Sequence, residues 1–485
     1  MKNNIYIYLI MIFLTSFQSC KKDVTVAPPI NSLTSTSIYS SSGTATAAVN
    51  GIFAQMSNID FFGSGNFGTA STCSSFFGLS ADELQVINGA NGRITPIAYT
   101  DSFGGLITEN LFWSSLYNTI YNANAAIEGL STTTAVTSPL KEQLIGEAEF
   151  VRAFCYFYLV NIYGDVPLIT STNYLVNQSA SRTAASDVYK QITNDLLDAK
   201  SKLSESYLSP SGKTATERIL PNKGAATALL ARVYLYLKDY TNAKLQAGEV
   251  IANSNYALLS DPNAVFLTNS QEAIWQIQPT VPGYNTPEGY MYTQLIANGG
   301  PDGVVAPIWF NDNFVNDFEN NDNRLKDWVK KVTSGASVYY VPFKYKLGAT
   351  ASGTPLQEYT MVLRLAEQYL ILAEAESALG DQASALQNLN IIRNRAGLPN
   401  SPLTPSSAQA QVMAAIFHER QVELFTELGH RWFDLKRSGA LDSVMGNPGN
   451  VCATKGGVWN TYLKFLPIPN SDIQSDPKLT QNPGY

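Results

Sequence analysis

The side chains best suited to hold a ligand are aromatic residues on a stretch rich in proline and glycine. Between residues 271 and 345, 13 of 75 residues are aromatic, a higher share than the 11% of the whole chain. Tyrosine and tryptophan rings stack on the C–H faces of a neutral sugar, while amide and guanidinium groups bond its hydroxyls. The ring candidates of this stretch are Tyr284, Tyr290, Tyr292 and Trp309.

A second group of ligand-binding candidates lies nearer the amino terminus. Glycines recur there, among them Gly63, Gly65 and Gly68, and they break any regular helix. The polar and aromatic candidates of this zone are Asn88, Asn91, Arg93 and Tyr99. For any single candidate in either group, ordinary packing or surface exposure is the alternative interpretation. The hypothesis therefore concerns the groups and not their individual members.

Catalytic and metal-binding chemistry finds little support in the sequence. The only histidines, His418 and His430, lack the H-E-x-x-H arrangement of a zinc hydrolase. A literal G-x-G-x-x-G at residues 63–68 follows a helical pattern, whereas a dinucleotide-binding fold requires a strand there. We therefore assign no catalytic residue, no metal ligand and no cofactor.

A group of charged residues in the carboxyl-terminal part is interpreted as structural. Its members are Glu419, Arg420, Glu423, Glu427 and Arg431. Glu427 and Arg431 are four residues apart, the spacing of an ion pair on one helix face, and the others share adjoining turns. Because no nucleophile stands nearby, we predict a lattice of ion pairs that holds helices together.

Composition narrows the class of partner. Hydrophobic residues make up 45% of the 485-residue chain, which indicates a folded protein. Charged residues make up only 15%, the net charge is -7, and no basic run occurs. Nucleic acid and anionic lipid both require a concentrated basic surface, so neither is expected as the ligand.

The amino terminus predicts export. An apolar run at residues 5–17 follows Lys2 and is too short to span a membrane, which is typical of a signal peptide over residues 1–19. Ser19 and Cys20 resemble the cleavage box of bacterial lipoproteins, so Cys20 is the predicted lipidation site and residues 20–36 the anchor and tether. Ordinary secretion is the alternative. The sequence leaves open the disulfide state of Cys73, Cys155 and Cys452.

Helical periodicity dominates the remainder of the chain. Residues 225–251 and 366–396 each read as two amphipathic helices with the small-residue spacing of a tetratricopeptide unit. Residues 147–163 and 184–203 resemble degenerate copies. The predicted fold is mainly α, a tetratricopeptide-like helical repeat scaffold of about four units, with a loop-rich insert that carries a few short strands.

Several sequence blocks resemble the SusD/RagB family. The most specific are H-E-R-Q-V-E-L at residues 418–424 and G-H-R-W-F-D-L-K-R at residues 429–437. Further blocks stand at 148–153, 163–168, 364–367, 393–397, 466–469 and 481–485. Leu428 departs from the pattern, because an acidic residue often precedes this glycine in the family.

The resemblance implies a cell-surface lipoprotein of the outer membrane that binds a glycan and caps a SusC-type TonB-dependent transporter. It implies one unit over residues 37–485. The helical scaffold would occupy about 37–60, 105–270 and 355–440, and the ligand-binding zones about 61–104 and 271–354. Some relatives bind peptides, so the resemblance does not name the ligand.

Two other functions stay open at this point. One is a tetratricopeptide scaffold that binds a peptide or protein in its concave groove. The other is a glycoside hydrolase, which needs two carboxyl groups converging on a cleft.

Overall fold

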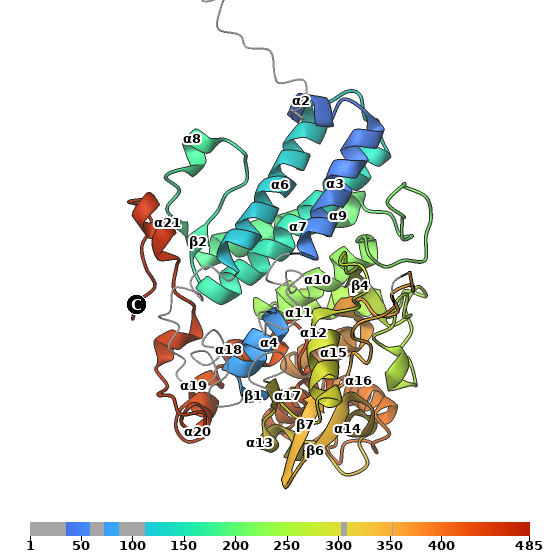
Figure 1. The fold of residues 1–485 in the computed structure, drawn as a ribbon, viewed down its shortest axis with the longest axis vertical. Helices are drawn as coiled ribbons and strands as arrows, with labels where there is room; N and C mark the ends of the chain where they lie inside the picture. Colours follow the sequence, from blue (N-terminus) through green and yellow to red (C-terminus); the bar gives the residue numbers. More distant parts are fainter. Residues whose placement is uncertain (1–34, 59–71, 87–111, 302–307, 352) are drawn as a thin grey trace, which may run out of the picture.

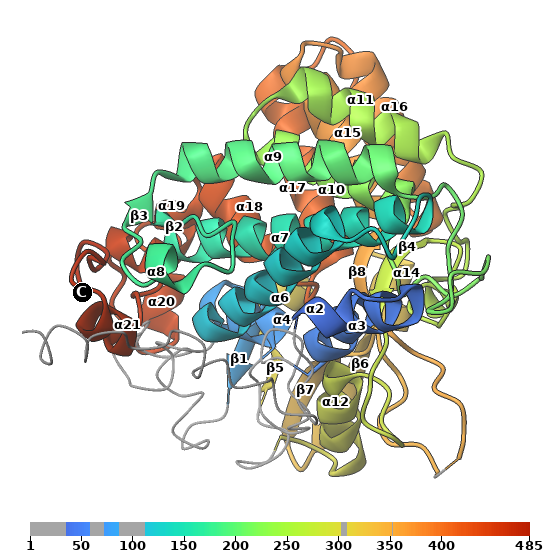
Figure 2. The ribbon, with the colours of Figure 1, turned by 90° about the horizontal axis from the view of Figure 1, so that it is seen from above.

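Helices stack in layers through most of the molecule, and two of the short sheets lie together on one side of it (Figures 1 and 2). The computed structural model describes residues 35–58, 72–86, 112–301, 308–351 and 353–485. The stacked helices are α3 (Ser42–Met56), α6 (Trp113–Thr132), α7 (Leu140–Tyr163), α9 (Ala185–Lys202), α10 (Lys223–Tyr236), α11 (Tyr240–Ile251), α15 (Leu365–Ala378), α16 (Gln382–Arg395) and α17 (Gln409–Leu424).

The pairs α10–α11 and α15–α16 confirm the two helix pairs predicted from the sequence, and they share one turn design. Lys238 and Gly380 adopt positive φ angles of 58° and 90° and end the first helix of each pair. The next residue, Asp239 or Asp381, caps the second helix, because its carboxylate accepts a backbone N–H from the first turn at 3.2 or 3.1 Å. The two turns therefore reverse the chain in the same way.

Small side chains let α10, α11 and α15 pack closely. Ala231, Ala243, Ala247 and Ala375 are completely buried in one cluster with Ile371. The predicted helix at 147–163 forms the buried centre of α7, which packs against α6 and α9. There the Arg152 guanidinium joins the helices, since it donates to Asp195 of α9 at 2.6 Å and to Asn124 of α6 at 2.9 Å.

The strands that the structure describes form four two-stranded antiparallel sheets. They are β1 (Leu84–Val86) with β5 (Ile308–Phe310), β2 (Val166–Pro167) with β3 (Arg182–Thr183), β4 (Ala273–Ile277) with β8 (Thr360–Arg364), and β6 (Val329–Ser334) with β7 (Ser337–Pro342). The β4–β8 pair is fully buried against α10 and α15. The β1–β5 pair lies beside β7 on the side of the molecule away from α16 (Figure 2).

Short helices complete the fold. They are α2 (Ser35–Ile38), α4 (Cys73–Ser80), α8 (Tyr174–Asn177), η1 (Pro262–Ala264), α12 (Pro287–Ala297), α13 (Asp312–Asn316), α14 (Asn323–Trp328), α18 (His430–Ser438), α19 (Leu441–Met445), α20 (Val451–Thr454), η2 (Thr461–Lys464) and α21 (Asn470–Ser475). Within the described ranges, no helix combines the length and apolar character needed to cross a bilayer. Cys73, Cys155 and Cys452 are buried and form no disulfide with one another.

The predicted lattice of ion pairs is confirmed, and it is buried. The carboxylate of Glu423 accepts from Arg364 at 2.6 Å and from Arg324 at 3.0 Å, and it also pairs with Arg395. Glu419 accepts from Arg324 at 2.6 Å, and Arg364 continues the network to Glu272 and Glu427. Burial opposes ionisation of Glu423, yet the three guanidinium groups hold its pKa well below the usual range.

One pair within that prediction is wrong. Glu427 and Arg431 do not share a helix, because α17 ends at Leu424 and Thr426, Leu428 and Gly429 take positive φ angles before α18 begins. Glu427 turns inward to Arg364, while Arg431 pairs with Asp82 at 2.6 Å. The signature segment therefore joins distant parts of the chain instead of closing on itself.

The buried network predicts a large loss of stability when its centre is removed. Glu423→Ala leaves three buried guanidinium groups without their shared partner, and breaking a buried pair costs about 3–5 kcal/mol. We expect the urea midpoint, followed by circular dichroism at pH 7, to fall accordingly. The matched control is Asp187→Ala, which removes an exposed pair with Lys190 that contributes under about 1 kcal/mol. Equal shifts in the two variants would contradict a stabilising network.

Candidate functional site

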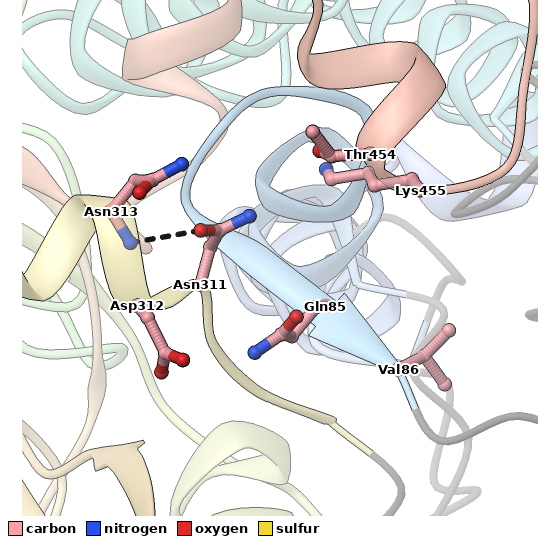
Figure 3. A pocket seen from close by; sticks show the side chains of 7 residues that line it. All are labelled: Gln85, Val86, Asn311, Asp312, Asn313, Thr454 and Lys455. Carbon is pink, nitrogen blue, oxygen red and sulfur yellow. Dashed lines mark hydrogen bonds between the residues drawn. The ribbon is translucent and has the colours of Figure 1, made fainter.

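A polar hollow of about 230 Å³ lies at the outer edge of the β1–β5 sheet. Its lining residues are Gln85, Val86, Asn311, Asp312, Asn313, Thr454 and Lys455. Figure 3 shows the amide side chains of Gln85 and Asn311 on neighbouring segments, with Asp312 and Asn313 to one side and Thr454 and Lys455 beyond. Three amides, a carboxylate and a hydroxyl are groups that bond sugar hydroxyls.

The predicted ligand residue Trp309 adjoins this hollow. It stands directly opposite Gln85 in the β1–β5 register, and opposite residues of an antiparallel pair project from the same face. Neighbouring Leu84, Ile308 and Phe310 are buried, whereas Trp309 is only half-buried. The face that carries Gln85 and Trp309 is therefore the outer one.

A tyrosine that the sequence analysis did not select completes the aromatic part of the site. The Tyr339 ring of β7 meets the Trp309 indole edge to face, with centroids 5.2 Å apart and an interplanar angle of 84°. Tyr339 is also half-buried. We call Trp309, Tyr339 and the residues that line the hollow the β1–β5 site.

Tyr284 and Tyr290 form a second aromatic pair. Their rings are 5.2 Å apart at 74°, and both are half-buried. Tyr290 lies in the first turn of α12, and Gly300, just beyond the end of that helix, lies beside the Tyr339 ring. At 1.5 Å per residue, the part of α12 from Tyr290 to Ala297 places about 10 Å of helix between the two aromatic pairs.

The remaining predicted residues divide into one buried tyrosine and several positions outside the described ranges. Tyr292 is only 2% exposed and faces the core, where burial and the nearby Glu288 carboxylate raise its pKa. It is therefore not placed to touch a ligand at the surface. Asn88, Asn91, Arg93, Tyr99 and Cys20 lie outside the residues that the structure describes.

The carboxyl-terminal segment fixes the position of β1. Lys455 donates to the carbonyl of Leu79 at 2.6 Å and to that of Ala81, although it is distant in sequence. Arg431 pairs with Asp82, the residue two positions before β1. The N–H of Leu428 donates to the Ser74 hydroxyl of α4 at 3.0 Å. These contacts hold the strand that presents Gln85.

Asn311 links the two sides of the hollow. Its N–H donates to the Glu83 carbonyl at 2.8 Å, and its side-chain oxygen caps α13 by accepting from the N–H of Asn313 at 2.9 Å (Figure 3). The Asn311–Asn313 cluster is thus a helix start. Among the described residues, no cluster of three metal-ligating side chains occurs there or elsewhere.

Sequence comparison and structural comparison agree on the kind of protein. A model described as "SusD family" matches residues 327–485, and one described as "Starch-binding associating with outer membrane" matches residues 88–235. SusD-like protein P25 of Formosa agariphila is 24% identical over 99% of both chains. The starch-binding protein SusD of Bacteroides thetaiotaomicron is 23% identical over 70% of this chain and 72% of its own.

Solved structures show the same fold. A SusD superfamily protein from Bacteroides vulgatus superposes with a TM-score of 0.76, at 20% identity, over 92% of this chain and 99% of its own. A laminarin-binding SusD-like protein superposes with a TM-score of 0.71, at 24% identity, over 91% and 99%. The fold is thus the mainly α, tetratricopeptide-like scaffold of the SusD superfamily. The chain belongs to the SusD/RagB family, which includes glycan-binding proteins.

A buried carboxyl group beneath the site predicts a specific pH dependence of stability. Burial, with the charge of Asp82 beside it, raises the pKa of Glu83 from 4.5 to about 8. Between these values the folded protein holds a proton that the unfolded chain has released, so Glu83 lowers stability as the pH rises. Glu83→Gln should therefore raise the urea midpoint at pH 8, and the gain should vanish near pH 4.5.

The control for this experiment is Glu217→Gln, which changes an exposed residue in the same way. Its midpoint should follow that of the wild type at both pH values. A Glu83→Gln variant that is no more stable than the wild type at pH 8 would contradict a protonated Glu83.

Proposed function

We propose that this protein binds a neutral glycan at the cell surface and passes it to a TonB-dependent transporter of the SusC type. The observation that carries the proposal is the β1–β5 site, where half-buried Trp309 and Tyr339 rings adjoin an amide-lined hollow. The names of two similar proteins, one starch-binding and one laminarin-binding, support a glycan as the ligand class.

The chemistry of the site favours a neutral ligand. Among the described residues, Lys455 is the only cation that lines the hollow, and its ammonium group is buried and donates to two backbone carbonyls. Asp312 contributes the only negative charge of that described lining. The described lining therefore consists mainly of neutral amides and a hydroxyl, groups that a neutral glycan can use together with the rings.

The second aromatic pair suits an extended ligand. Tyr284 and Tyr290 lie at one end of α12 and Tyr339 beyond the other, with about 10 Å of helix between them. We assign Tyr284, Tyr290, Trp309, Asn88, Asn91, Arg93 and Tyr99 to the ligand-binding surface. Val86 ends β1 next to the segment that contains Asn88, which supports a common site for both zones.

Binding without hydrolysis fits the distribution of carboxyl groups. A glycosidase requires two carboxyl groups about 5–9.5 Å apart across the sugar. Within the described part of the lining, Asp312 is the only acidic residue, and the side chain of Glu83 is buried. The protein is accordingly assigned as a receptor and not as an enzyme.

The proposed location is the outer membrane, anchored by lipid on Cys20 after removal of residues 1–19. It is supported by the sequence of the amino terminus and by the family description "associating with outer membrane". Residues 20–36 then act as the tether of one unit over residues 37–485. Cys20→Ser tests the anchor, because fatty-acid labelling and sedimentation with membranes should both be lost.

Removing the tryptophan tests the site. Truncating an aromatic anchor costs about 2 kcal/mol or more at a binding site, so Trp309→Ala should weaken binding by roughly thirtyfold or more. We would measure retardation of the mature protein, without lipid, in gels containing neutral polysaccharides, and assay the mixtures for released reducing ends. At least one polysaccharide should retard the wild-type protein. The same mixtures should contain no newly released reducing ends.

Two controls separate loss of the ring from loss of the fold. Trp309→Phe keeps an aromatic face and should restore part of the retardation. Leu245→Ala removes an exposed apolar side chain from α11 and should change nothing. Undiminished retardation of Trp309→Ala would contradict the assigned site, and released sugars would favour a hydrolase. Absence of retardation by every polysaccharide would contradict a neutral glycan as ligand.

A further inference from the structure

A larger hollow lies between α6, α8 and the segment around α21, and it shares no lining residue with the β1–β5 site. Its volume is about 600 Å³, within the roughly 300–1,000 Å³ typical of ligand pockets. Figures 1 and 2 both place α8 and α21 near each other beside α6. We refer to it as the α6–α8 hollow.

Three aromatic residues of α6 line one wall at intervals of four. Trp113, Tyr117 and Tyr121 therefore lie on one helix face, about 6 Å apart per step. Trp113 is buried at the floor and its ring packs on Tyr117 with centroids 4.9 Å apart. Tyr121 stands at the rim and is 53% exposed. Tyr174 of α8 also lines the hollow and is 71% exposed.

Hydrogen bonds fix the walls relative to one another. The Tyr117 hydroxyl donates to the Pro167 carbonyl at 2.8 Å, and the Trp113 indole N–H donates to Asp472 at 3.2 Å. The carboxylate of Glu128 on α6 accepts from the N–H of Thr172, just before α8, at 2.9 Å. The hollow is therefore shaped by contacts within the chain.

The polar groups of the lining complement the rings. Asn118, Asn177 and Gln178 supply neutral amides, and Asp472 and Asp476 supply carboxylates. No lysine or arginine occurs among the described residues that line the hollow. Lys478 lies outside the lining, where its ammonium group reaches the Ser179 hydroxyl at 3.4 Å. Within the described part of the chain, neither Tyr121 nor Tyr174 donates or accepts a side-chain hydrogen bond, so both hydroxyls are available.

We infer that the α6–α8 hollow is a second binding site for a neutral glycan, separate from the β1–β5 site. The inference rests on the proposed function, because it assigns the same ligand class to a different surface. Exposed rings beside neutral amides suit the faces and hydroxyls of a sugar, and the two carboxylates disfavour an acidic one. Two sites on one chain would retain a long polysaccharide more strongly than either site alone.

The test removes the rim tyrosines. Tyr121→Ala with Tyr174→Ala should lower retardation by a long neutral polysaccharide at least about tenfold. In the Trp309→Ala background the same double change should remove the residual retardation. In a titration with a short oligosaccharide, the number of ligands bound per chain should fall from two in the wild type to one in the tyrosine double variant. Leu175→Ala, beside Tyr174 but outside the lining, is the matched control and should behave as the wild type.

The outcomes separate this inference from the proposed function. Unchanged retardation and stoichiometry in the tyrosine double variant, together with loss in Trp309→Ala, would overturn the second site and leave the first intact. Loss only in the tyrosine double variant would support the hollow and overturn the β1–β5 assignment. Alginate is an acidic polysaccharide. If alginate retarded the wild-type protein but not the Tyr121→Ala, Tyr174→Ala variant, the ligand of the α6–α8 hollow would not be neutral and the inference would be overturned. Co-purification with the transporter provides a further readout. If both Leu175→Ala and the tyrosine double variant lost co-purification but kept glycan retardation, the hollow would be a protein-docking surface and not a glycan site.

Discussion

Three arginines from separate segments converge on one buried carboxylate, and the arrangement of the two sides of the molecule depends on it. Arg324 comes from α14, Arg364 from the end of β8 and Arg395 from the end of α16, and each pairs with Glu423 of α17. Charges in the interior lose their hydration, so they are tolerated only when every group finds a partner. The helices and the strand that carry these residues must therefore assemble together for the network to close.

The network extends toward the β1–β5 site through packed rings. Lys344 pairs with Glu427 and lies 3.8 Å from the centre of the Phe425 ring. Phe425 in turn packs against Phe310, with centroids 5.4 Å apart, and Phe310 follows Trp309 in β5. On the other strand, Arg431 holds Asp82 ahead of β1. Residues of the family signature thus support the site without lining the hollow.

Local patterns were sufficient to predict two helix pairs. The spacing of small residues identified them, because this signal acts within a few residues. Pairings across the chain were not predictable in the same way. Glu427 and Arg431 have the spacing of a helical pair, and only the left-handed residues Thr426, Leu428 and Gly429 send them to different partners.

In the candidate site, too, local features could be predicted from the sequence, whereas contacts between distant segments could not. Trp309 was selected from its aromatic, loop-rich surroundings, yet Tyr292 satisfied the same criterion and lies in the core. Burial within α12 depends on which face packs inward, and a tyrosine suits either face. Gln85, Asn311, Thr454 and Lys455 were missed because the hollow forms only when β1, β5 and α20 meet. The pairing of Gln85 with Trp309 across β1 and β5 cannot be predicted from a single sequence.

The central claim is that a neutral glycan rests on the aromatic and amide groups of the β1–β5 site. The most direct measurement is a crystal structure of the mature protein with an oligosaccharide from the polysaccharide that retards it most strongly. The account predicts an intact sugar ring against Trp309, with its hydroxyls bonded to the amides beside it. A sugar bound only on the concave helical face, or one found cleaved, would contradict it.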